Sequence, residues 1–327
     1  MILVIGGSGF IGAHLVREAL GRGERVRVYD RDPFPEEGFG QPQETVQGDI
    51  LDEDRLVSAM AGCGTVYHLA GIAHLWSRDR RVFDRVNRQG TETVLRAAAA
   101  SGIGRLVYTG TESILVPRRN AQPVTEDAAP ELRDMIGPYC RSKFLAERAV
   151  FRAAQSGLPV TVVAPTMPIG PGDRNLTPPG RMIEQLLRGR IPAYMHCRLN
   201  VVDVRDAALG HVLAAQKARP GSRLLLAGHN VTLKSFLDEA ARAAGVRPPG
   251  FRIPYGVALA WSWMEHVLGL ATGREPQSSV TGVRLCRRSL TFDGSGTWRL
   301  LGHQPRPLQE TIGDAVQWHG QRMQEGA

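Results

Sequence analysis

The sequence predicts an α/β protein built on a doubly wound parallel sheet, with a smaller, mainly helical C-terminal part. Short apolar segments alternate with amphipathic helical patterns along the first half of the chain, as they do in parallel sheets. A glycine-rich turn follows the first of these segments directly. After Pro165 the pattern changes, because prolines and glycines crowd into residues 168–180, which indicates a loop-rich excursion from the sheet.

Each predicted element follows from the period of its apolar residues. Runs of β-branched and apolar residues predict strands, whereas apolar residues three and four positions apart predict helices, as in segment 11–20. The predicted strands are 2–5, 25–30, 45–47, 65–69, 105–109 and 159–164, and the longer helices are 82–101 and 139–156. Two later strands, 200–204 and 224–227, are predicted to return to the sheet, and helices dominate from Thr232 onward.

Composition argues against several classes of protein. The 327 residues carry a formal net charge of +8, but no basic run is interleaved with aromatics, so nucleic-acid binding is not expected. Lysine occurs only at Lys143, Lys217 and Lys234, so 40 − 3 = 37 basic residues are arginine, which indicates a compositional bias. The four cysteines lack zinc-ligand spacing. We therefore expect a reduced, cytoplasmic protein without a metal site.

One long apolar segment, 255–273, stands out in the second half. Glu265 and His266 interrupt it, which argues against a membrane span but leaves open a helix that lies peripherally on a lipid surface. Its apolar side chains could equally form core or line a pocket: Val257, Leu259, Trp261, Trp263, Met264, Val267 and Leu268. These interpretations stay open at this point.

The turn after the first strand has the spacing G-x-x-G-x-x-G, at Gly6, Gly9 and Gly12. Glycine is needed where backbone must approach a pyrophosphate closely, and the helix that begins near Phe10 and Ile11 supplies amide donors at its N-terminus. Because the turn joins a strand to a helix, it predicts a dinucleotide-binding loop rather than a turn without a ligand.

Acidic residues end the next two strands. Asp30 can accept hydrogen bonds from an adenosine ribose and would repel a 2′-phosphate, which favours NAD. Arg31 could pair with that phosphate, so NADP stays open, and a plain charged loop is the alternative to both. Asp49, followed by Ile50, is predicted to bind the adenine amino group unless it merely caps the next helix.

Tyr139 and Lys143 are four residues apart, which places both on one face of the predicted helix. A free phenol, with a pKa near 10, is a poor base at neutral pH, and a nearby ammonium favours the phenolate. The pair therefore predicts a site for general acid/base catalysis. Its occurrence in a chain with three lysines makes a chance match less credible.

Hydroxyl and amide side chains complete the predicted site. Thr111 follows the strand 105–109, and its hydroxyl could hydrogen-bond the reacting oxygen beside Tyr139, with Ser113 as the second candidate. Asn87 falls in the middle of a predicted helix, where asparagine is not favoured. It could hold a water or a helix carbonyl in a proton relay, or be a tolerated polar residue.

As a set, these motifs resemble the extended short-chain dehydrogenase/reductases. The shared features are the glycine loop, Asp49, His68-Leu69-Ala70, Asn87 with Gly90-Thr91, Thr111, and Tyr139 with Lys143. The resemblance covers essentially the whole chain and implies hydride transfer with NAD(P). It further implies that Tyr139 is the general acid/base, that Lys143 holds the nicotinamide ribose, and that Thr111 replaces the commoner serine.

The same resemblance divides the chain. Residues 1–165, joined again by 199–228, would form an NAD(P)-binding Rossmann domain, and 166–198 with 229–327 would form the substrate-binding domain. Four further residues would lie beside the cofactor: Leu69, Ala70, Pro165 and Met167. The family also implies a homodimer through the helices 82–101 and 139–156.

Within the family, the chain is most similar to hopanoid-associated proteins named sugar epimerases, and also to dihydroflavonol reductases and 3β-hydroxysteroid dehydrogenases. Thr177-Pro178-Pro179-Gly180-Arg181 and Thr272-Gly273-Arg274-Glu275-Pro276 are among the motifs that carry this likeness. Asp30 departs from it, because an apolar residue is expected beside Arg31, and this departure favours NAD.

The substrate is expected to be a lipid-like secondary alcohol or ketone, such as a sterol or hopanoid. Nucleotide-sugar members typically carry Asn where this chain has Met167, and Arg where it has Leu199, with Arg198 one position off. A 4-carboxysterol oxidised at its 3-hydroxyl would become a β-keto acid able to lose carbon dioxide. A nucleotide-sugar epimerase or dehydratase and a non-catalytic dinucleotide sensor are the alternatives.

Overall fold

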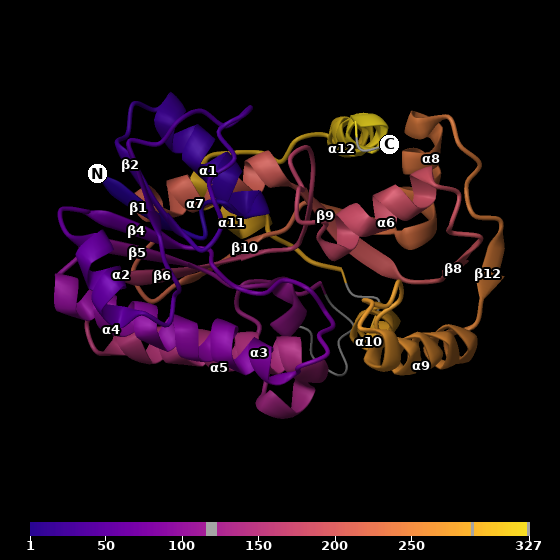
Figure 1. The fold of residues 1–327 in the computed structure, drawn as a ribbon, viewed down its shortest axis with the longest axis horizontal. Helices are drawn as coiled ribbons and strands as arrows, with labels where there is room; N and C mark the ends of the chain where they lie inside the picture. Colours follow the sequence, from indigo (N-terminus) through magenta and orange to yellow (C-terminus); the bar gives the residue numbers. More distant parts are fainter. Residues whose placement is uncertain (116–122, 289–290, 326–327) are drawn as a thin grey trace.

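The computed structural model describes residues 1–115, 123–288 and 291–325. Its centre is a seven-stranded sheet in the order β10-β6-β5-β4-β1-β2-β3, in which every neighbouring pair is parallel (Figure 1). The strands are β1 (Ile2–Ile5), β2 (Val26–Asp30), β3 (Glu44–Gln47), β4 (Thr65–His68), β5 (Arg105–Thr109), β6 (Val160–Pro165) and β10 (Arg223–Leu226). The predicted doubly wound parallel sheet is confirmed.

Helices cover both faces of this sheet, as Figure 1 shows. One face packs against α2 (Glu53–Met60), α4 (Gly90–Ser101) and α5 (Gly137–Gln155), and the other against α1 (Phe10–Gly21), α7 (Val204–Lys217) and α11 (Ser295–Leu301). Successive strand residues point to opposite faces, so Leu3 enters one core cluster and Val4 the other. This double burial explains why the strands are continuously apolar.

A second, three-stranded sheet has the order β11-β9-β7, with β7 (Met167–Ile169), β9 (Arg198–Asp203) and β11 (His229–Thr232). The prediction that 200–204 returns to the large sheet is therefore wrong, whereas β10 does join it beside β6. The apolar pattern of β9 predicts a strand but carries no information about which strand pairs with it.

The rest of the chain is mainly helical, as predicted. Helices α6 (Pro178–Leu187), α8 (Leu233–Ala244) and α12 (Leu308–Glu325) share one apolar cluster with β7 and β9. Helices α9 (Tyr255–Thr272) and α10 (Val280–Arg288) pack together, and β12 (Phe251–Ile253) pairs with β8 (Ala193–Met195). Within the described ranges, no helix combines the length and the apolarity that a membrane crossing requires.

The predicted helix 82–101 is divided. A short α3 (Arg81–Phe83) runs into a π-helical turn, η1 (Asp84–Gln89), which continues into α4. The period of the apolar residues predicts a helix in this segment, but it carries no information about a locally wider turn within that helix. Such turns are rare and often occur at functional sites.

His14 on α1 is 5% exposed and donates from Nε2 to the Pro171 carbonyl, 2.8 Å away. Burial lowers the pKa of His14 from 6.5 to about 4. Between these values only the unfolded chain gains the proton, so acid favours unfolding. We expect the stability advantage of the wild type over His14→Gln to shrink by about 1–2 kcal/mol from pH 7 to pH 5. Urea unfolding of both proteins measures this; a pH-independent difference would contradict it.

Candidate active site

The glycine loop lies at the carboxyl end of β1, where its backbone leaves no room for side chains. Gly6 has a φ of 85°, and a Cβ on it would lie 2.4 Å from the Ala70 nitrogen. A Cβ on Gly12 would lie 2.1 Å from the Gly6 carbonyl oxygen. Gly9 caps α1 without a side-chain hydrogen bond. The helix N-terminus is therefore approachable by a phosphate group, as a dinucleotide requires.

Asp30, at the end of β2, faces this loop. Its carboxylate accepts hydrogen bonds from the Ser8 nitrogen (2.8 Å) and the Asp32 nitrogen (3.1 Å). Arg31 is exposed. The Asp30 carboxylate is thus held against the glycine loop, whereas Arg31 is exposed to solvent.

The segment after β3 lies on the same edge of the sheet. Asp49 is exposed, and its Oδ1 accepts a hydrogen bond from the Leu51 nitrogen at 3.0 Å. The residue that caps α2 is Asp52, so the helix-cap alternative for Asp49 is wrong. Ile50 is buried against Gly90, where a Cβ would lie 2.3 Å from its Cδ1.

The predicted residues after β4 and β6 also reach this edge. The Leu69 and Ala70 nitrogens both donate to the Ile5 carbonyl, at 2.8 and 3.0 Å, which holds the end of β4 beside the glycine loop. Pro165 ends β6, and Met167 begins β7 and is half-buried. The structure thus brings the carboxyl ends of five strands of the parallel sheet, β1, β2, β3, β4 and β6, to one edge.

Tyr139 and Lys143 share the buried face of α5, where they are 7% and 8% exposed. The Lys143 ammonium donates to the Thr109 carbonyl at 2.7 Å and lies 4.9 Å from the centroid of the Tyr108 ring. Burial lowers the pKa of Lys143 to about 8. Most of the lysine therefore stays charged at pH 7, close to the catalytic candidate on its own helix.

Thr111 opens a 3₁₀ turn, η2 (Glu112–Ile114), directly after β5. Its hydroxyl donates to Glu112 Oε2 at 2.9 Å and accepts from the Ser113 nitrogen at 3.2 Å. Burial raises the pKa of Tyr139, and a hydrogen bond with Thr111 acts in the opposite direction. Thr111 and Tyr139 are thus adjacent, as their spacing from β5 and α5 suggested.

Glu112 is a feature of this site that the sequence did not predict. Its two carboxylate oxygens accept hydrogen bonds from Thr111 and from the Ser113 hydroxyl (3.3 Å). Burial raises the pKa of Glu112. An acidic residue three positions after the end of β5, next to Thr111, was the available signal.

Asn87 lies in the π-helical turn and is 2% exposed. Its Oδ1 accepts from the Ile72 nitrogen (2.8 Å), and its Nδ2 donates to the Ile72 carbonyl (3.2 Å) and to Ser142 Oγ (3.1 Å). The amide thus ties the loop after β4 to α5, one residue before Lys143. These three hydrogen bonds argue against a merely tolerated polar residue, and the proton relay stays a prediction.

Apolar side chains surround Tyr139. Its ring meets that of Phe83 edge to face, with centroids 6.4 Å apart. Other members of this cluster come from α10, from η2 and from the loops after β4 and before α11: Ile72, Leu75, Ile114, Leu115, Leu285 and Phe292. The phenol therefore faces apolar surroundings in which Thr111, Lys143 and Glu112 supply the polar groups.

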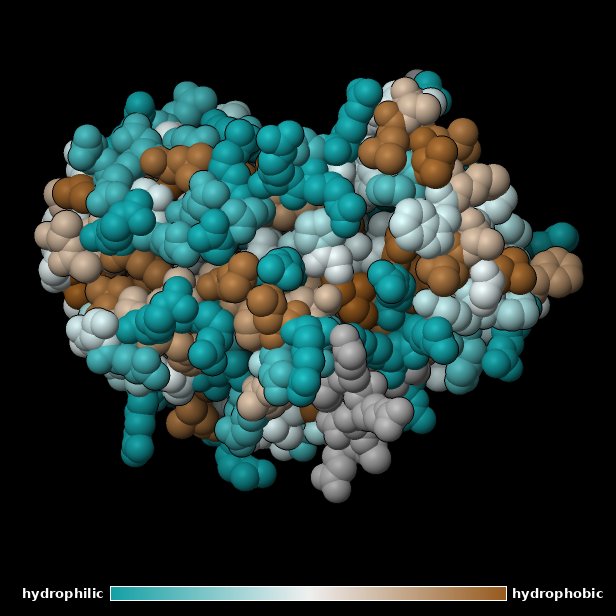
Figure 2. All heavy atoms as spheres, turned by 90° about the horizontal axis from the view of Figure 1, so that it is seen from below, coloured by the Kyte–Doolittle hydropathy of each residue, from teal (hydrophilic) through white to brown (hydrophobic). Residues whose placement is uncertain are grey.

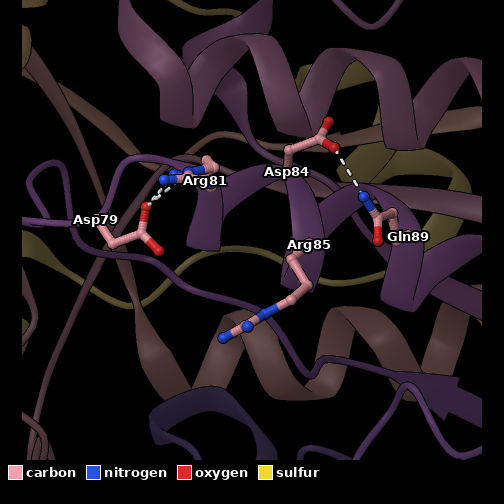
Figure 3. Close-up of a pocket in the computed structure, with 5 residues that line it drawn as sticks. All are labelled: Asp79, Arg81, Asp84, Arg85 and Gln89. Atoms are coloured by element: carbon pink, nitrogen blue, oxygen red, sulfur yellow. Dashed lines mark hydrogen bonds and ion pairs between the residues drawn. The ribbon is translucent and has the colours of Figure 1, made fainter.

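Two cavities open at the surface near this site, and the second shares Ala227 and Phe292 with the apolar cluster. One, of about 340 Å³, is polar and lies along α3 and η1 (Figure 3), lined by Asp79, Arg81, Asp84, Arg85 and Gln89. Another, of about 820 Å³, opens between residues 227–230 and 292–305. In the first, an ion pair joins Arg81 to Asp79, and the Gln89 side-chain amide donates a hydrogen bond to Asp84, as the dashed lines in Figure 3 show.

A seven-stranded Rossmann sheet, a glycine-lined helix N-terminus, and a buried Tyr-x-x-x-Lys pair beside a threonine hydroxyl define an oxidoreductase of the extended short-chain dehydrogenase/reductase type. The chain belongs to the NAD dependent epimerase/dehydratase family, whose model matches residues 2–227.

Relatives of known description support this assignment. A putative dihydroflavonol 4-reductase of Synechocystis is 34% identical over 96% of this chain and 93% of its own. The human sterol-4-alpha-carboxylate 3-dehydrogenase, decarboxylating, is 31% identical over 78% of this chain and 69% of its own. The crystal structure of gox2253 superposes with a TM-score of 0.85 at 30% identity and covers 98% of both chains.

Proposed function

We propose that this enzyme interconverts a secondary alcohol and a ketone on an apolar polycyclic substrate, a sterol or hopanoid, with NAD as cofactor. The observation that carries this proposal is the setting of the Tyr139 phenol. It is buried among apolar side chains on the same helix face as Lys143 and next to Thr111. A hydroxyl or keto group on an apolar ring system fits such a site, because the ring would contact the apolar side chains while its oxygen lies beside Tyr139 and Thr111.

The residues at the sheet edge fit a dinucleotide. The glycine loop admits backbone–phosphate contact, Asp30 is held where ribose hydroxyls would donate to it, and Lys143 has a charged ammonium for the second ribose. The nicotinamide, when bound, accepts or supplies the hydride. Asp49, Ile50, Leu69 and Ala70 would border the adenine side, and Pro165 and Met167 the nicotinamide side.

The chain's own residues handle the proton. In oxidation, Tyr139 Oη would take the proton of the substrate hydroxyl, and in reduction it would return it. Thr111, with Ser113 as the second candidate, would donate a hydrogen bond to the same substrate oxygen after turning its proton away from Glu112, to which both hydroxyls donate in this structure. The charge of Lys143 would favour the phenolate. Burial raises the pKa of Tyr139, and the hydrogen bond with Thr111 lowers it. Asn87 would act as a positioning residue, since it fixes α5 next to Lys143.

Two residues support an apolar substrate over a nucleotide sugar. Met167 occupies the position where an Asn is typical of nucleotide-sugar enzymes. On β9, Leu199 packs against apolar neighbours whereas the adjacent Arg198 is exposed, as alternation along a strand requires. The human relative named for a sterol 4α-carboxylate fits the same substrate class. With such a substrate, oxidation at C3 would give a β-keto acid that loses carbon dioxide.

The cofactor preference tests the role of Asp30. We expect kcat/KM to be at least about tenfold higher with NAD than with NADP, because the fixed carboxylate would face the 2′-phosphate. Asp30→Ser should narrow this difference. Asp32→Asn, which removes a charge two residues away, is the matched control and should leave it unchanged. A preference of the wild type for NADP would show that Arg31 governs the choice.

The substrate class is tested by titration calorimetry on the NAD-loaded enzyme. We expect binding of compounds from a panel of 3-hydroxysterols, 3-ketosterols and hopanoids, and none of UDP or UDP-sugars, because the described side chains around Tyr139 are mainly apolar. Micromolar binding of the nucleotides without the lipids would contradict the proposal and support a nucleotide-sugar epimerase or dehydratase. A cofactor that never turns over with any alcohol or ketone would instead support a dinucleotide sensor.

Two further parts of the proposal concern organisation. We propose that 166–198 and 229–327 bind the substrate while the large sheet binds the cofactor. We also propose a homodimer through α4 and α5, which the resemblance to the extended enzymes implies. Light scattering of the purified protein measures the mass and would show a monomer if this assembly is wrong.

A further inference from the structure

Helix α9 exposes its large apolar side chains and buries small or polar ones, the reverse of an ordinary surface helix. The side that faces the protein carries small or polar residues, with Ala258, Ser262 and Gly269 buried. Both ionisable residues of the helix also point this way: Glu265 accepts from the Ser278 nitrogen at 2.6 Å, and His266 Nδ1 accepts from Trp76 Nε1 at 2.9 Å. The two ionisable side chains that interrupt the apolar segment are thus directed away from its outer face.

The outward side of α9 is apolar along its whole length. Its large side chains are between 40 and 61% exposed: Val257, Trp261, Trp263, Met264, Val267, Leu268 and Leu270. Phe251, on the preceding strand β12, is 74% exposed. Figure 2 views the molecule from the side on which α9 lies, and brown and pale spheres gather at its right-hand end. A continuous exposed surface of this kind marks an interaction site.

Arginines border this surface. Residues 251–288 contain five arginines and two glutamates, and Glu265 and Glu275 are both engaged, the latter with Arg181 at 2.6 Å. Exposed guanidinium groups lie at both ends of α9 and along α10: Arg252, Arg274, Arg284 and Arg287. The Arg287 guanidinium lies 4.3 Å from the Tyr255 ring, and Arg78 reaches the other end, 3.9 Å from where a Cβ on Gly273 would lie.

We propose that α9 docks flat on an anionic lipid bilayer, with its tryptophans at the interface and the bordering arginines against lipid phosphates. An apolar helix face without charges, rimmed by basic residues and rich in tryptophan, has the composition of interfacial helices. A second copy of the chain is disfavoured as the occupant. In a symmetric pair of these surfaces, the basic borders would face each other and repel.

The docked surface would lie close to the catalytic candidate. Helix α10 packs against α9 and also against the start of α5, where a Cβ on Gly137 would lie 2.6 Å from Thr281 Oγ1. Gly137 is two residues from Tyr139. If the substrate is the apolar lipid proposed above, it could pass from the bilayer to the site over this short path. That step rests on the proposed function, whereas the docking itself does not.

Vesicle binding tests the docking independently of activity. We expect the full-length protein to co-sediment with phosphatidylcholine vesicles that contain phosphatidylglycerol, and more weakly with phosphatidylcholine alone or at high salt. Tryptophan emission should shift to the blue and be quenched by brominated lipid. The double variant Trp261→Glu/Val267→Glu should bind at least about tenfold more weakly, because it places charges in the acyl boundary.

A matched control is Leu300→Glu, which puts the same charge at a leucine of α11 that is 51% exposed. It should bind vesicles as the wild type does, and thermal unfolding checks that both variants are folded. Absence of vesicle binding, or equal binding by the wild type and the α9 variant, would overturn the proposal. The proposal would also be overturned if the wild type bound no vesicles but formed a concentration-dependent oligomer that the α9 variant does not form. That result would identify a second copy of the chain as the occupant of this surface.

Discussion

Replacing Tyr139 by phenylalanine is expected to lower kcat by at least about a hundredfold, the usual weight of general acid/base catalysis. The affinity for NAD should stay nearly unchanged. Phenylalanine keeps the ring that packs against Phe83 and removes only the hydroxyl, so the surrounding apolar cluster should be preserved. Steady-state kinetics with a substrate found by calorimetry, together with a direct NAD titration, measures both quantities.

Tyr67→Phe is the control for this experiment. Tyr67 is also a buried tyrosine, but its side chain belongs to the core cluster on the opposite face of the sheet from α5. It should retain wild-type turnover. If Tyr139→Phe did so as well, Tyr139 would not be the acid/base, and Glu112 would become the candidate, since its carboxyl is adjacent to Thr111.

Replacing Lys143 by methionine should impair two functions at once. We expect NAD to bind at least about tenfold more weakly and kcat to fall about a hundredfold or more, because one ammonium would serve both the ribose and the phenol. The buried methylene stem is retained by methionine, so the change is mainly the loss of charge and of the bond to the Thr109 carbonyl. Lys217→Met, on α7, removes another lysine of this lysine-poor chain and should leave NAD affinity intact.

The pH dependence of NAD binding distinguishes a direct role of Lys143 from a structural one. Burial lowers the pKa of Lys143 to about 8, so the free enzyme loses the ammonium as the pH rises through that value. NAD affinity of the wild type should therefore decrease above about pH 8, and that decrease should be absent in Lys143→Met. A decrease of equal size in both proteins would show that the lysine only supports the fold.

Local sequence signals predicted the glycine loop and the common helix face of Tyr139 and Lys143, because each signal depends on neighbouring residues. Gly6 and Gly12 follow a strand directly, and Tyr139 and Lys143 are one helical turn apart, so their relative placement needs no knowledge of the distant chain. Signals that depend on distant partners were less informative. The pairing of β9 with β7 and β11 is an example, since the strand's own residues do not specify it.

The orientation of α9 could not be predicted for the same reason. Glu265 and His266 interrupt the apolar segment, but the groups that hold them inward, the Ser278 nitrogen and Trp76, come from other parts of the chain. The sequence therefore left core, pocket and lipid surface open. The structure shows that most of the large apolar side chains of this helix are exposed.

The π-helical turn at Asp84–Gln89 sets the directions in which the residues within it point. A π-helical turn holds one residue more than the α-helical turn it replaces, so a one-residue deletion there would restore the α-helical period and leave the flanking helices in nearly the same phase. The helix would persist, but the residues within the turn would point in other directions, and Asn87 would lose its hydrogen bonds to Ile72 and Ser142. A surface loop tolerates the deletion of one residue. In this π-helical turn the same deletion would break the hydrogen bonds through which Asn87 connects α5 to the loop after β4.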